Sequence, residues 1–557
     1  MRTIILLFMP ISNAFLHNAA PMIRLVHKHQ CFFSNTCREV SQSRLSRLAP
    51  ASSLHTLADS DAETRNTVML LMSPSRLRLR DNVALTRAAE LGSDGLSICI
   101  ATKLPASSQA LTPVEAFWIE AVRRLNDELE KLGQHLWLLP SHDEFLQAVQ
   151  ELKPSHVVLD TCLIDRHKKH ALAIRDNLQS TNIIVEEVLD DGTLIAFEDV
   201  AKILGRSRQG GRVLRWSTFL SNTMNKEMDI EGHLRPIPTL PRPLSNSTKT
   251  LPVPSIDMFP FWAKDLLEIW GDVKEEEALL RANNSAASSF SSLLTEKGSR
   301  NSKLSPYLRW GIISPQRAAH SGVRLRDLLW RDWSHVSYAL LGPLQRGDAV
   351  MEFMDNPCKS DLHIPNTSDV DLFNLWCVGN TGSQLVDAGM RQLWKEGWIP
   401  RKIRLLAAAC LVEGLNVDWR FGRDWFAHTL IDHDPAINEA MWQNAGLCGV
   451  DPFYAGIIWE KPPSGQEEID YVQKWSKEPL IWPPPLKPYS SLEPPLQILE
   501  GAEARRNALR ERGIYKSART ISNAGVRVAW EGLATKTSVK EGEVIGSGNV
   551  LVDKLKL

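Results

Sequence analysis

The chain has few cysteines, and they form no cluster. Only eight occur in 557 residues, with no CxxC pair and no Cys/His group at the spacing of metal ligands. We therefore expect neither a metal site nor a disulfide framework, and a reducing compartment fits this cysteine usage best.

Long apolar runs and net charge are also lacking. No stretch approaches the roughly 18 apolar residues that a membrane-spanning helix needs, so we expect no membrane partner. The 64 Lys and Arg balance 65 Asp and Glu, which leaves a formal charge of -1. Any affinity for nucleic acid must then come from a local basic surface. No GxGxxG motif follows the first expected strand, which argues against a dinucleotide-dependent dehydrogenase.

The N-terminal segment has no acidic residue before position 39. A short apolar stretch, Ile4–Met9, precedes Asn13-Ala14-Phe15 and a segment that contains Ser and Arg. We interpret residues 1–66 as a targeting presequence or disordered segment, directed to the plastid or alternatively to the mitochondrion.

Residues 67–202 alternate between short apolar runs and helical stretches. The runs predict five buried strands of a parallel, Rossmann-like α/β sheet: Val68–Met72, Leu96–Ala101, Leu136–Leu139, Val157–Leu159 and Ile183–Val185. The clearest helix, residues 113–133, begins with Pro, ends with Gly and carries one apolar stripe.

The rest of the chain divides by composition. Residues 203–256 are rich in Ser, Arg, Pro and Asn and predict an interdomain linker. Residues 257–480 predict an all-α domain with buried helices, of which Ile403–Leu415 is almost continuously apolar. Residues 481–557 begin with a Pro-rich stretch and predict a C-terminal extension.

Several polar strings in the helical half are specific enough to carry a resemblance: Asn301–Leu308, Leu328–Trp333, Thr381-Gly382, Val386–Leu393 and Asp432–Asn444. Through these strings, residues 67–475 resemble the photolyase/cryptochrome family of flavoproteins. The resemblance implies an α/β antenna domain followed by an all-α FAD-binding domain that uses blue light for electron transfer. The segment Arg76–Asn82 is similar to a motif of the antenna domain. A second antenna chromophore is left open.

The resemblance also implies which residues bind FAD: Asn301, Ser302, Lys303, Leu304, Ser305, Arg331, Trp398, Arg404, Asp432, His433, Asp434 and Asn438. Small hydroxylated residues at a helix start suit a pyrophosphate, although helix capping alone would explain Ser302 and Ser305. The family role of Asp432 is an ion pair with Arg404 beside the flavin. For Asp434 a helix N-cap before Pro435 is the structural alternative.

A second group of residues is implied to act in catalysis: Asp327, Trp330, Trp419, Trp442 and Asn438. Asn438 matches the position that faces flavin N5, where an amide suits the reduced flavin used in repair. Trp442 and Trp419 match the first two tryptophans of the family's electron-transfer chain, whereas core packing is the ordinary role of a Trp on a helix. The third tryptophan has no clear counterpart.

The substrate cavity departs from the family pattern. The family's catalytic carboxylate falls at Asp327, and Trp330 keeps one aromatic wall, but the second wall falls at Asn444. We expect this loss to weaken dimer binding and to favour single-stranded or looped DNA. The cavity-forming stretches are rich in arginine and lysine, which fits phosphate contacts or a solvated helix face.

The sequence therefore predicts an enzyme, a deoxyribodipyrimidine photo-lyase that acts as a monomer on UV-damaged DNA. Asn438 favours repair. A cryptochrome-like photoreceptor and a non-catalytic flavin-binding scaffold are the alternatives.

Overall fold

The computed structural model describes residues 65–71, 76–105, 111–162, 165–189, 192–196, 199, 203, 212–213, 215–224, 234–244, 251–287, 302–349, 369–449, 457–478, 502–511 and 527–528. The expected targeting segment lies outside these residues except for its last two positions. Among the described residues, no helix has the length and apolar character to cross a membrane. No group of three or more His, Cys, Asp or Glu residues there is placed to hold a metal ion.

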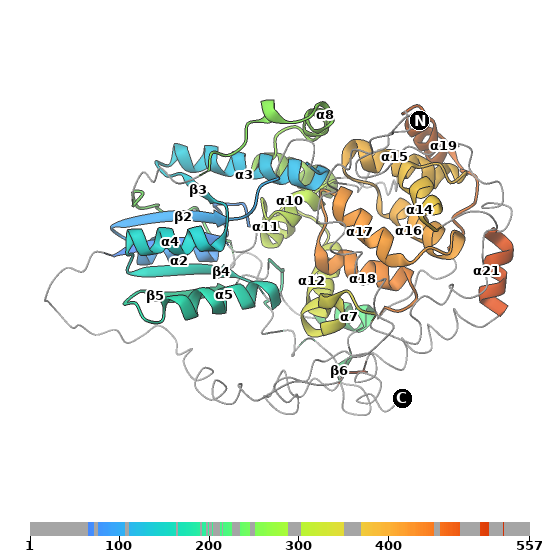
Figure 1. Ribbon diagram of the computed structural model, residues 1–557. Coiled ribbons are helices and arrows are strands. Elements are labelled where there is room, and N and C mark those ends of the chain that lie inside the picture. Colours follow the sequence, from blue (N-terminus) through green and yellow to red (C-terminus); the bar gives the residue numbers. More distant parts are fainter. Residues whose placement is uncertain are drawn as a thin grey trace, which may run out of the picture. The chain divides into compact units, whose positions relative to one another are not determined.

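The N-terminal part is a five-stranded sheet in which every pair of neighbouring strands is parallel. Its order is β3-β2-β1-β4-β5, and helices cover it (Figure 1). The elements are β1 (Asn66–Leu71), α2 (Val83–Leu91), β2 (Gly95–Ala101), α3 (Pro113–Lys131), β3 (Leu136–Leu139), α4 (His142–Leu152), β4 (His156–Thr161), α5 (Asp165–Leu178) and β5 (Ile184–Leu189). The predicted parallel α/β sheet is confirmed.

The alternation of side chains along each strand divides the sheet's apolar residues between two clusters. In β1, Met69 and Leu71 pack into a cluster that extends through α3 into the helical part of the chain. Val68 and Leu70 pack into a second cluster, with residues of α4 and α5. Because both faces of β1 to β4 are buried, these strands contain short continuous apolar runs. The edge strand β5 is partly exposed and contains Glu186 and Glu187.

Helix α3 begins with a reciprocal cap. Thr112 Oγ1 accepts from the backbone N–H of Glu115 at 3.1 Å, and Glu115 Oε2 accepts from the N–H of Thr112 at 2.9 Å. The helix ends at Lys131, two residues before the predicted end at Gly133, which has a positive φ of 75°.

The expected linker contains ordered elements. A short antiparallel pair joins β6 (Arg212–Val213) to β7 (Arg527–Val528) in the C-terminal extension. Helix α7 (Trp216–Met224) follows β6. Polar, uncharged residues dominate α7, which is why its helical period is weak in the sequence.

The remaining described elements are helical, as predicted for residues 257–480, and helix α21 lies in the C-terminal extension, where no helix was predicted. They are η4 (Ile256–Met258), α8 (Phe261–Trp270), α9 (Glu275–Ala287), α10 (Ser305–Arg309), α11 (Pro315–His320), α12 (Leu325–Leu340), α13 (Gly342–Arg346), α14 (Asp369–Val378), α15 (Gln384–Glu396), α16 (Arg401–Ala409), η6 (Cys410–Gly414), α17 (Trp419–Thr429), α18 (Pro435–Ala445), α19 (Gln466–Trp475) and α21 (Ala502–Glu511). The predicted apolar helix 403–415 is α16 continued by the single π-helical turn η6.

Asp81 joins the α/β part to the helical part. Its carboxylate accepts from the backbone N–H of Arg235 at 2.5 Å, from Ser314 Oγ at 2.9 Å and from Arg317 Nε at 3.0 Å. Asp81 is 6% exposed, and its φ is 51°. Nearby, Arg76 forms a buried ion pair with Asp160 on β4. The motif Arg76–Asn82 therefore stabilises the junction between the two parts.

The string Val386–Leu393, which carried much of the resemblance, has a structural role. Asp387 accepts from the N–H and Oγ1 of Thr381, both at 2.7 Å, and from the N–H of Gly382 at 2.9 Å. Burial raises the pKa of Asp387 to about 6, although these hydrogen bonds oppose the shift. A Cβ at Gly389 would lie 2.0 Å from Ile403, so this position needs glycine for α15 to pack on α16.

Candidate functional site

A cavity of about 1060 Å³ lies within the helical part. Its walls come from α10, α12, α16 and α18, and from α7 of the expected linker. Fourteen of the predicted site residues line it: Ser302, Lys303, Leu304, Ser305, Asp327, Trp330, Arg331, Trp398, Arg404, Asp432, His433, Asp434, Asn438 and Trp442. Trp419 does not line the cavity, and Asn301 lies outside the described residues.

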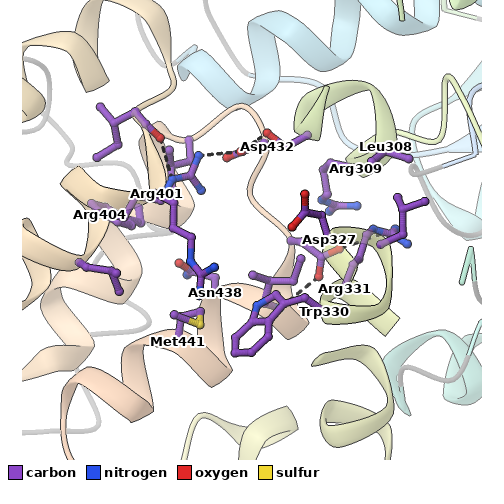
Figure 2. Close-up of a pocket in the computed structure, with 18 of the residues that line it drawn as sticks. Leu308, Arg309, Asp327, Trp330, Arg331, Arg401, Arg404, Asp432, Asn438 and Met441 are labelled. Atoms are coloured by element: carbon purple, nitrogen blue, oxygen red, sulfur yellow. Dashed lines mark hydrogen bonds and ion pairs between the residues drawn. The ribbon is translucent and has the colours of Figure 1, made fainter. Parts of the chain in front are cut away.

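Asp432 is the centre of a hydrogen-bond chain on one wall. Its Oδ2 accepts from Arg404 Nη2 at 2.7 Å and from Ser305 Oγ at 2.6 Å, and Trp398 Nε1 donates to Ser305 Oγ at 3.1 Å. Arg404 is further fixed by its Nε, which donates to the carbonyl of Ile399 at 3.0 Å. The expected ion pair is present, and Figure 2 shows it on the cavity wall.

Asp434 is the N-cap of α18 as well as a cavity residue. Its Oδ1 accepts from the backbone N–H groups of Ala436 at 3.0 Å and Ile437 at 3.3 Å. Its Oδ2 lies 2.7 Å from Nε2 of His335 and 3.9 Å from Nη2 of Arg331. Burial alone would raise the pKa of Asp434, but His335 and the nearby arginines outweigh it and hold the pKa well below its usual range. The same carboxylate therefore caps α18 and serves as an ionised group of the site.

Two histidines beside Asp434 are held neutral. Burial lowers the pKa of His335, and Arg331 acts in the same direction against the attraction of Asp434. Because Asp434 is ionised and can only accept, the neutral ring of His335 donates its Nε2–H to it. Burial and the charge of Arg309 lower the pKa of His433 to about 4. Arg309 Nε donates to the carbonyl of His433.

The charged group of Lys303 is paired with a buried carboxylate. Its Nζ lies 3.0 Å from Oε2 of Glu396, and both side chains are almost fully buried. Gln392 Nε2 donates to the same oxygen at 2.8 Å. Lys303 has a positive φ of 49°, so the backbone turns sharply just before α10. The ammonium group of Lys303 therefore connects the segment before α10 to α15. Lys303 also lines the cavity, and its contact with a cofactor stays a prediction.

The other phosphate-site candidates make local contacts. Ser302 Oγ accepts from the N–H of Leu304 at 3.3 Å, which is a contact within the turn before α10, and α10 itself has no side-chain cap. Arg331 Nη1 donates to the carbonyl of Gly192, in the segment after β5. Arg331 thus connects that segment to Asp434, and it borders the cavity with its charge close to a carboxylate.

The side-chain amide of Asn438, on α18, is fixed by a hydrogen bond to α17. Its Nδ2 donates to the carbonyl of Arg423 at 3.0 Å. Because a carbonyl oxygen only accepts, this contact settles which end of the amide is the nitrogen. The amide oxygen is left to serve as the acceptor of this side chain on the cavity wall.

The tryptophan contacts differ from the expected chain. Trp442 borders the cavity and lies 5.0 Å from Phe426 and 6.1 Å from Trp376, measured between ring centroids. Trp419 is 1% exposed, and in the described part of the chain its ring neighbours are the guanidinium groups of Arg420 and Arg423, at 4.7 and 5.4 Å. The aromatic contact that leads away from Trp442 therefore passes to Trp376.

The expected substrate side is formed around Trp330. Trp330 borders the cavity, and its ring lies 4.8 Å from Trp216 of α7 and 5.0 Å from Trp333. Asp327 is half exposed and pairs with Arg324, whose Nη2 lies 2.7 Å from Oδ2. Asn444 is 0% exposed and does not line the cavity. The expectation that Asn444 stands at the second wall is therefore wrong.

Sequence reasoning missed several residues in the cavity or beside it. His335 contacts Asp434 but does not line the cavity. It follows Arg331 by four positions, so the two share one face of α12, and this spacing was the available signal. Met441 lines the cavity, and Figure 2 shows it with Asn438 and Trp330 at the end away from Asp432. Five residues of α7 line the cavity at helical spacing: Trp216, Ser217, Leu220, Ser221 and Met224. Only the helical period of 216–224 could have indicated them.

The residues present fit a large, flat, anionic cofactor such as FAD. Asp432 Oδ1 is buried and has no hydrogen-bond partner among the described residues, so it can accept from a cofactor N–H or O–H. Arg331, Arg404 and Arg309 supply positive charge around the same cavity. Apolar surface from Leu308, Phe426 and Ile437 completes it.

Comparison with known families gives two matches. Residues 324–479 match the family described as "FAD binding domain of DNA photolyase", and residues 69–216 match the one described as "DNA photolyase". Together they cover more than half of the chain.

Curated relatives carry related names. A deoxyribodipyrimidine photo-lyase of Agrobacterium fabrum is 26% identical over 442 residues, which cover 72% of this chain and 85% of the relative. One from Vibrio cholerae is 26% identical over 437 residues, covering 72% and 88%. A cryptochrome DASH of Danio rerio is 28% identical over 294 residues, covering 45% and 53%. The names include both branches of one family.

Solved structures agree in fold. A bacterial class III photolyase from Agrobacterium tumefaciens superposes with a TM-score of 0.62 at 22% identity, covering 83% of this chain and 99% of that one. An archaeal photolyase from Sulfolobus tokodaii, described with two FAD molecules, gives a TM-score of 0.58 at 20% identity, covering 81% and 100%. At these identities the likeness establishes the fold.

Proposed function

Because this chain belongs to the photolyase/cryptochrome family, we propose that it binds FAD and uses blue light to repair pyrimidine dimers in UV-damaged DNA. The observation that carries the proposal is the cavity itself, in which Asp432, Asp434 and Asn438 meet the aromatic wall of Trp330. The relatives named deoxyribodipyrimidine photo-lyase support the enzyme class.

Ser305, Arg404, Asp432, Asp434 and Asn438 would hold FAD. When bound, FAD supplies the light-absorbing group and the electron for the repair reaction. Asp432 is oriented by Arg404 and Ser305, so it presents a fixed acceptor. Trp398 restrains Ser305 through its indole N–H. Little reorganisation is needed before binding, which is the condition for tight binding.

Asn438 and His335 govern hydrogen bonds on the α12–α18 side. The amide oxygen of Asn438 accepts at the cavity wall because its nitrogen is committed to Arg423. His335 is neutral and donates its Nε2–H to Asp434. This hydrogen bond stabilises the ionised carboxylate without adding a positive charge to the site. The site thus combines an anionic acceptor with a neutral amide acceptor.

The mouth of the cavity supports a nucleic-acid partner. Arg324, Arg326 and Arg401 line the same cavity as Trp330, and such cations can contact phosphates while an extruded base stacks on the indole. We infer that unpaired lesions in single-stranded or looped DNA are preferred, because they spare the energy of base flipping.

Several finer points are part of the proposal. We expect a monomer whose residues 1–66 direct it to the plastid, or alternatively to the mitochondrion. A second antenna chromophore in the α/β part is consistent with the Sulfolobus tokodaii relative that holds two FAD molecules.

A blue-light photoreceptor is the second candidate. Helix α21 of the C-terminal extension packs against the π turn η6, whose Glu413 lines the cavity. Arg506 of α21 also pairs with Glu460. A tail in contact with the wall of the cofactor cavity is the arrangement that a light signal would use. The relative named cryptochrome DASH is consistent with this role.

One experiment separates these functions. The protein is purified without added flavin, its absorption spectrum is recorded, and light-dependent repair is measured on a defined thymine dimer in single-stranded and duplex DNA. We expect FAD near one-to-one stoichiometry and repair that is faster on the single strand. A flavin-bound protein that repairs neither form would move the assignment to the photoreceptor. A folded protein that binds no added FAD would refute both.

A further inference from the structure

The guanidinium group of Arg401 lies over the ring of Trp330. The distance from its carbon to the ring centroid is 5.2 Å. Both residues line the cavity, and Figure 2 shows them in the same view of its wall. The indole is braced by the rings of Trp216 and Trp333. The ring that Arg401 covers is therefore a fixed platform.

The position of Arg401 in its helix is unfavourable for a cation. Arg401 is the first residue of α16, where the helix dipole favours acids. Two other cations share this turn: Lys402 pairs with Glu468, and Arg404 pairs with Asp432. Arg401 has its guanidinium group over an aromatic ring, which is a favourable contact for this group.

The backbone at Arg401 is rigid while its side chain is exposed. Pro400 precedes it, and the N–H of Arg404 donates to the Pro400 carbonyl at 3.1 Å. Ile399 is 0% exposed and its carbonyl accepts from Arg404 Nε. The long side chain can therefore move without any change in the helix start.

The present spacing leaves no room for a base. A planar ring stacked between two others needs layers roughly 3.5 Å apart, so about 7 Å from the indole to the guanidinium. An outward movement of about 2 Å would open that slot.

We propose that Arg401 supplies the second stacking wall, so that an extruded pyrimidine is held between the indole of Trp330 and the guanidinium plane of Arg401. The proposal rests on the proposed repair function and takes the place of the wall expected at Asn444. A guanidinium plane stacks on nucleobases, whereas the ammonium group of lysine has charge without a plane.

The test compares Arg401→Lys with Arg401→Ala. Binding is measured in the dark, with a labelled single-stranded oligonucleotide that carries one thymine dimer and with the same oligonucleotide undamaged. Because stacking on a base is worth about 1–3 kcal/mol, Arg401→Lys should weaken dimer binding about fivefold or more and leave undamaged binding unchanged. Arg401→Ala should weaken both. Arg346→Lys is the control for an arginine-to-lysine substitution as such. Arg346 is an exposed residue of α13 that pairs with Asp348.

FAD content and thermal melting are measured for each variant, so that a collapsed cavity is recognised. If Arg401→Lys keeps the wild-type ratio of dimer to undamaged affinity, the second wall is refuted while the repair function stands. If the flavin-bound wild type binds both oligonucleotides equally, the repair function itself fails, and the wall with it.

Discussion

His335 Nε2 and Asp434 Oδ2 lie 2.7 Å apart, between α12 and the first residue before α18. Through this contact one carboxylate serves three groups: the imidazole and the backbone N–H groups of Ala436 and Ile437. The start of α18 is therefore tied to α12 by a single side chain.

Replacing Asp434 should separate its two roles. Asp434→Ala removes the N-cap of α18 and the hydrogen-bond acceptor of His335. We therefore expect the free energy of unfolding to fall by about 2–3 kcal/mol. Asp434→Asn keeps a good N-cap residue and should cost less than half of that. Chemical denaturation of the two variants checks this, and equal losses would contradict the capping role.

Stability should fall as the pH is lowered from about 6.5 to about 4. His433 has a folded pKa of about 4, below the 6.5 of an unfolded histidine, so in this window the unfolded chain binds a proton that the folded chain excludes. His433→Asn should flatten the fall by up to about 1.4 kcal/mol per pH unit. Unfolding at several pH values measures it. Parallel curves for wild type and variant would show that His433 is not the group responsible.

Lys303 and Glu396 should behave as a buried pair. Lys303→Met leaves the carboxylate of Glu396 without its cation, and we expect a loss of about 3–5 kcal/mol. Adding Glu396→Gln should restore most of that loss, because no buried charge then remains. Urea unfolding of the single and double variants gives the coupling. A double variant as unstable as Lys303→Met would argue against the pairing.

Asn444→Trp should destabilise the protein. The side chain is fully buried, and a Cβ at Gly449 would lie 2.3 Å from its Oδ1, so no space for an indole exists there. We expect a loss of about 1–3 kcal/mol from overpacking and no gain in dimer binding. Thermal melting and oligonucleotide binding test both parts. Improved binding without loss of stability would restore Asn444 to the cavity wall.

Trp376 should matter for light-driven reduction of bound FAD. Trp442 contacts Trp376, and the next ring, Phe373, lies 6.0 Å from Trp376. We expect Trp376→Phe to slow photoreduction at least as much as Trp419→Phe. The rate of flavin bleaching under blue light, with an external reductant present, gives the comparison. An unchanged rate in Trp376→Phe, with a slow one in Trp419→Phe, would favour the chain expected from the sequence.

The sheet and most of the cavity could be predicted because they leave local signals. Buried parallel strands are apolar runs, and the cavity residues fall in short strings such as Asp432–Asn444. Contacts between distant segments leave no such signal. Glu396 is 93 residues from Lys303, so nothing near Lys303 indicated that its charge was already engaged.

The same limit explains the cavity mouth. Helix α7 is a wall only because Trp216 packs on Trp330, more than a hundred residues later. Asn444 follows Trp442 by two positions, so on a helix it points to a different side, into the interior. The resemblance identified Asn444 as the position of interest, but the surrounding packing determines that its side chain lies in the interior and not on the cavity wall.

The junction at Asp81 has a consequence for folding. One carboxylate, in the segment before α2, holds the backbone of Arg235, 154 residues further along the chain, and Arg317 at the start of α11, 236 residues further along. Neither part can open there without stranding a buried charge, so the two should lose their tertiary structure in one cooperative transition. Slowly exchanging amides of β1 and α12 would then share a common opening free energy, and Asp81→Ala would split it into two.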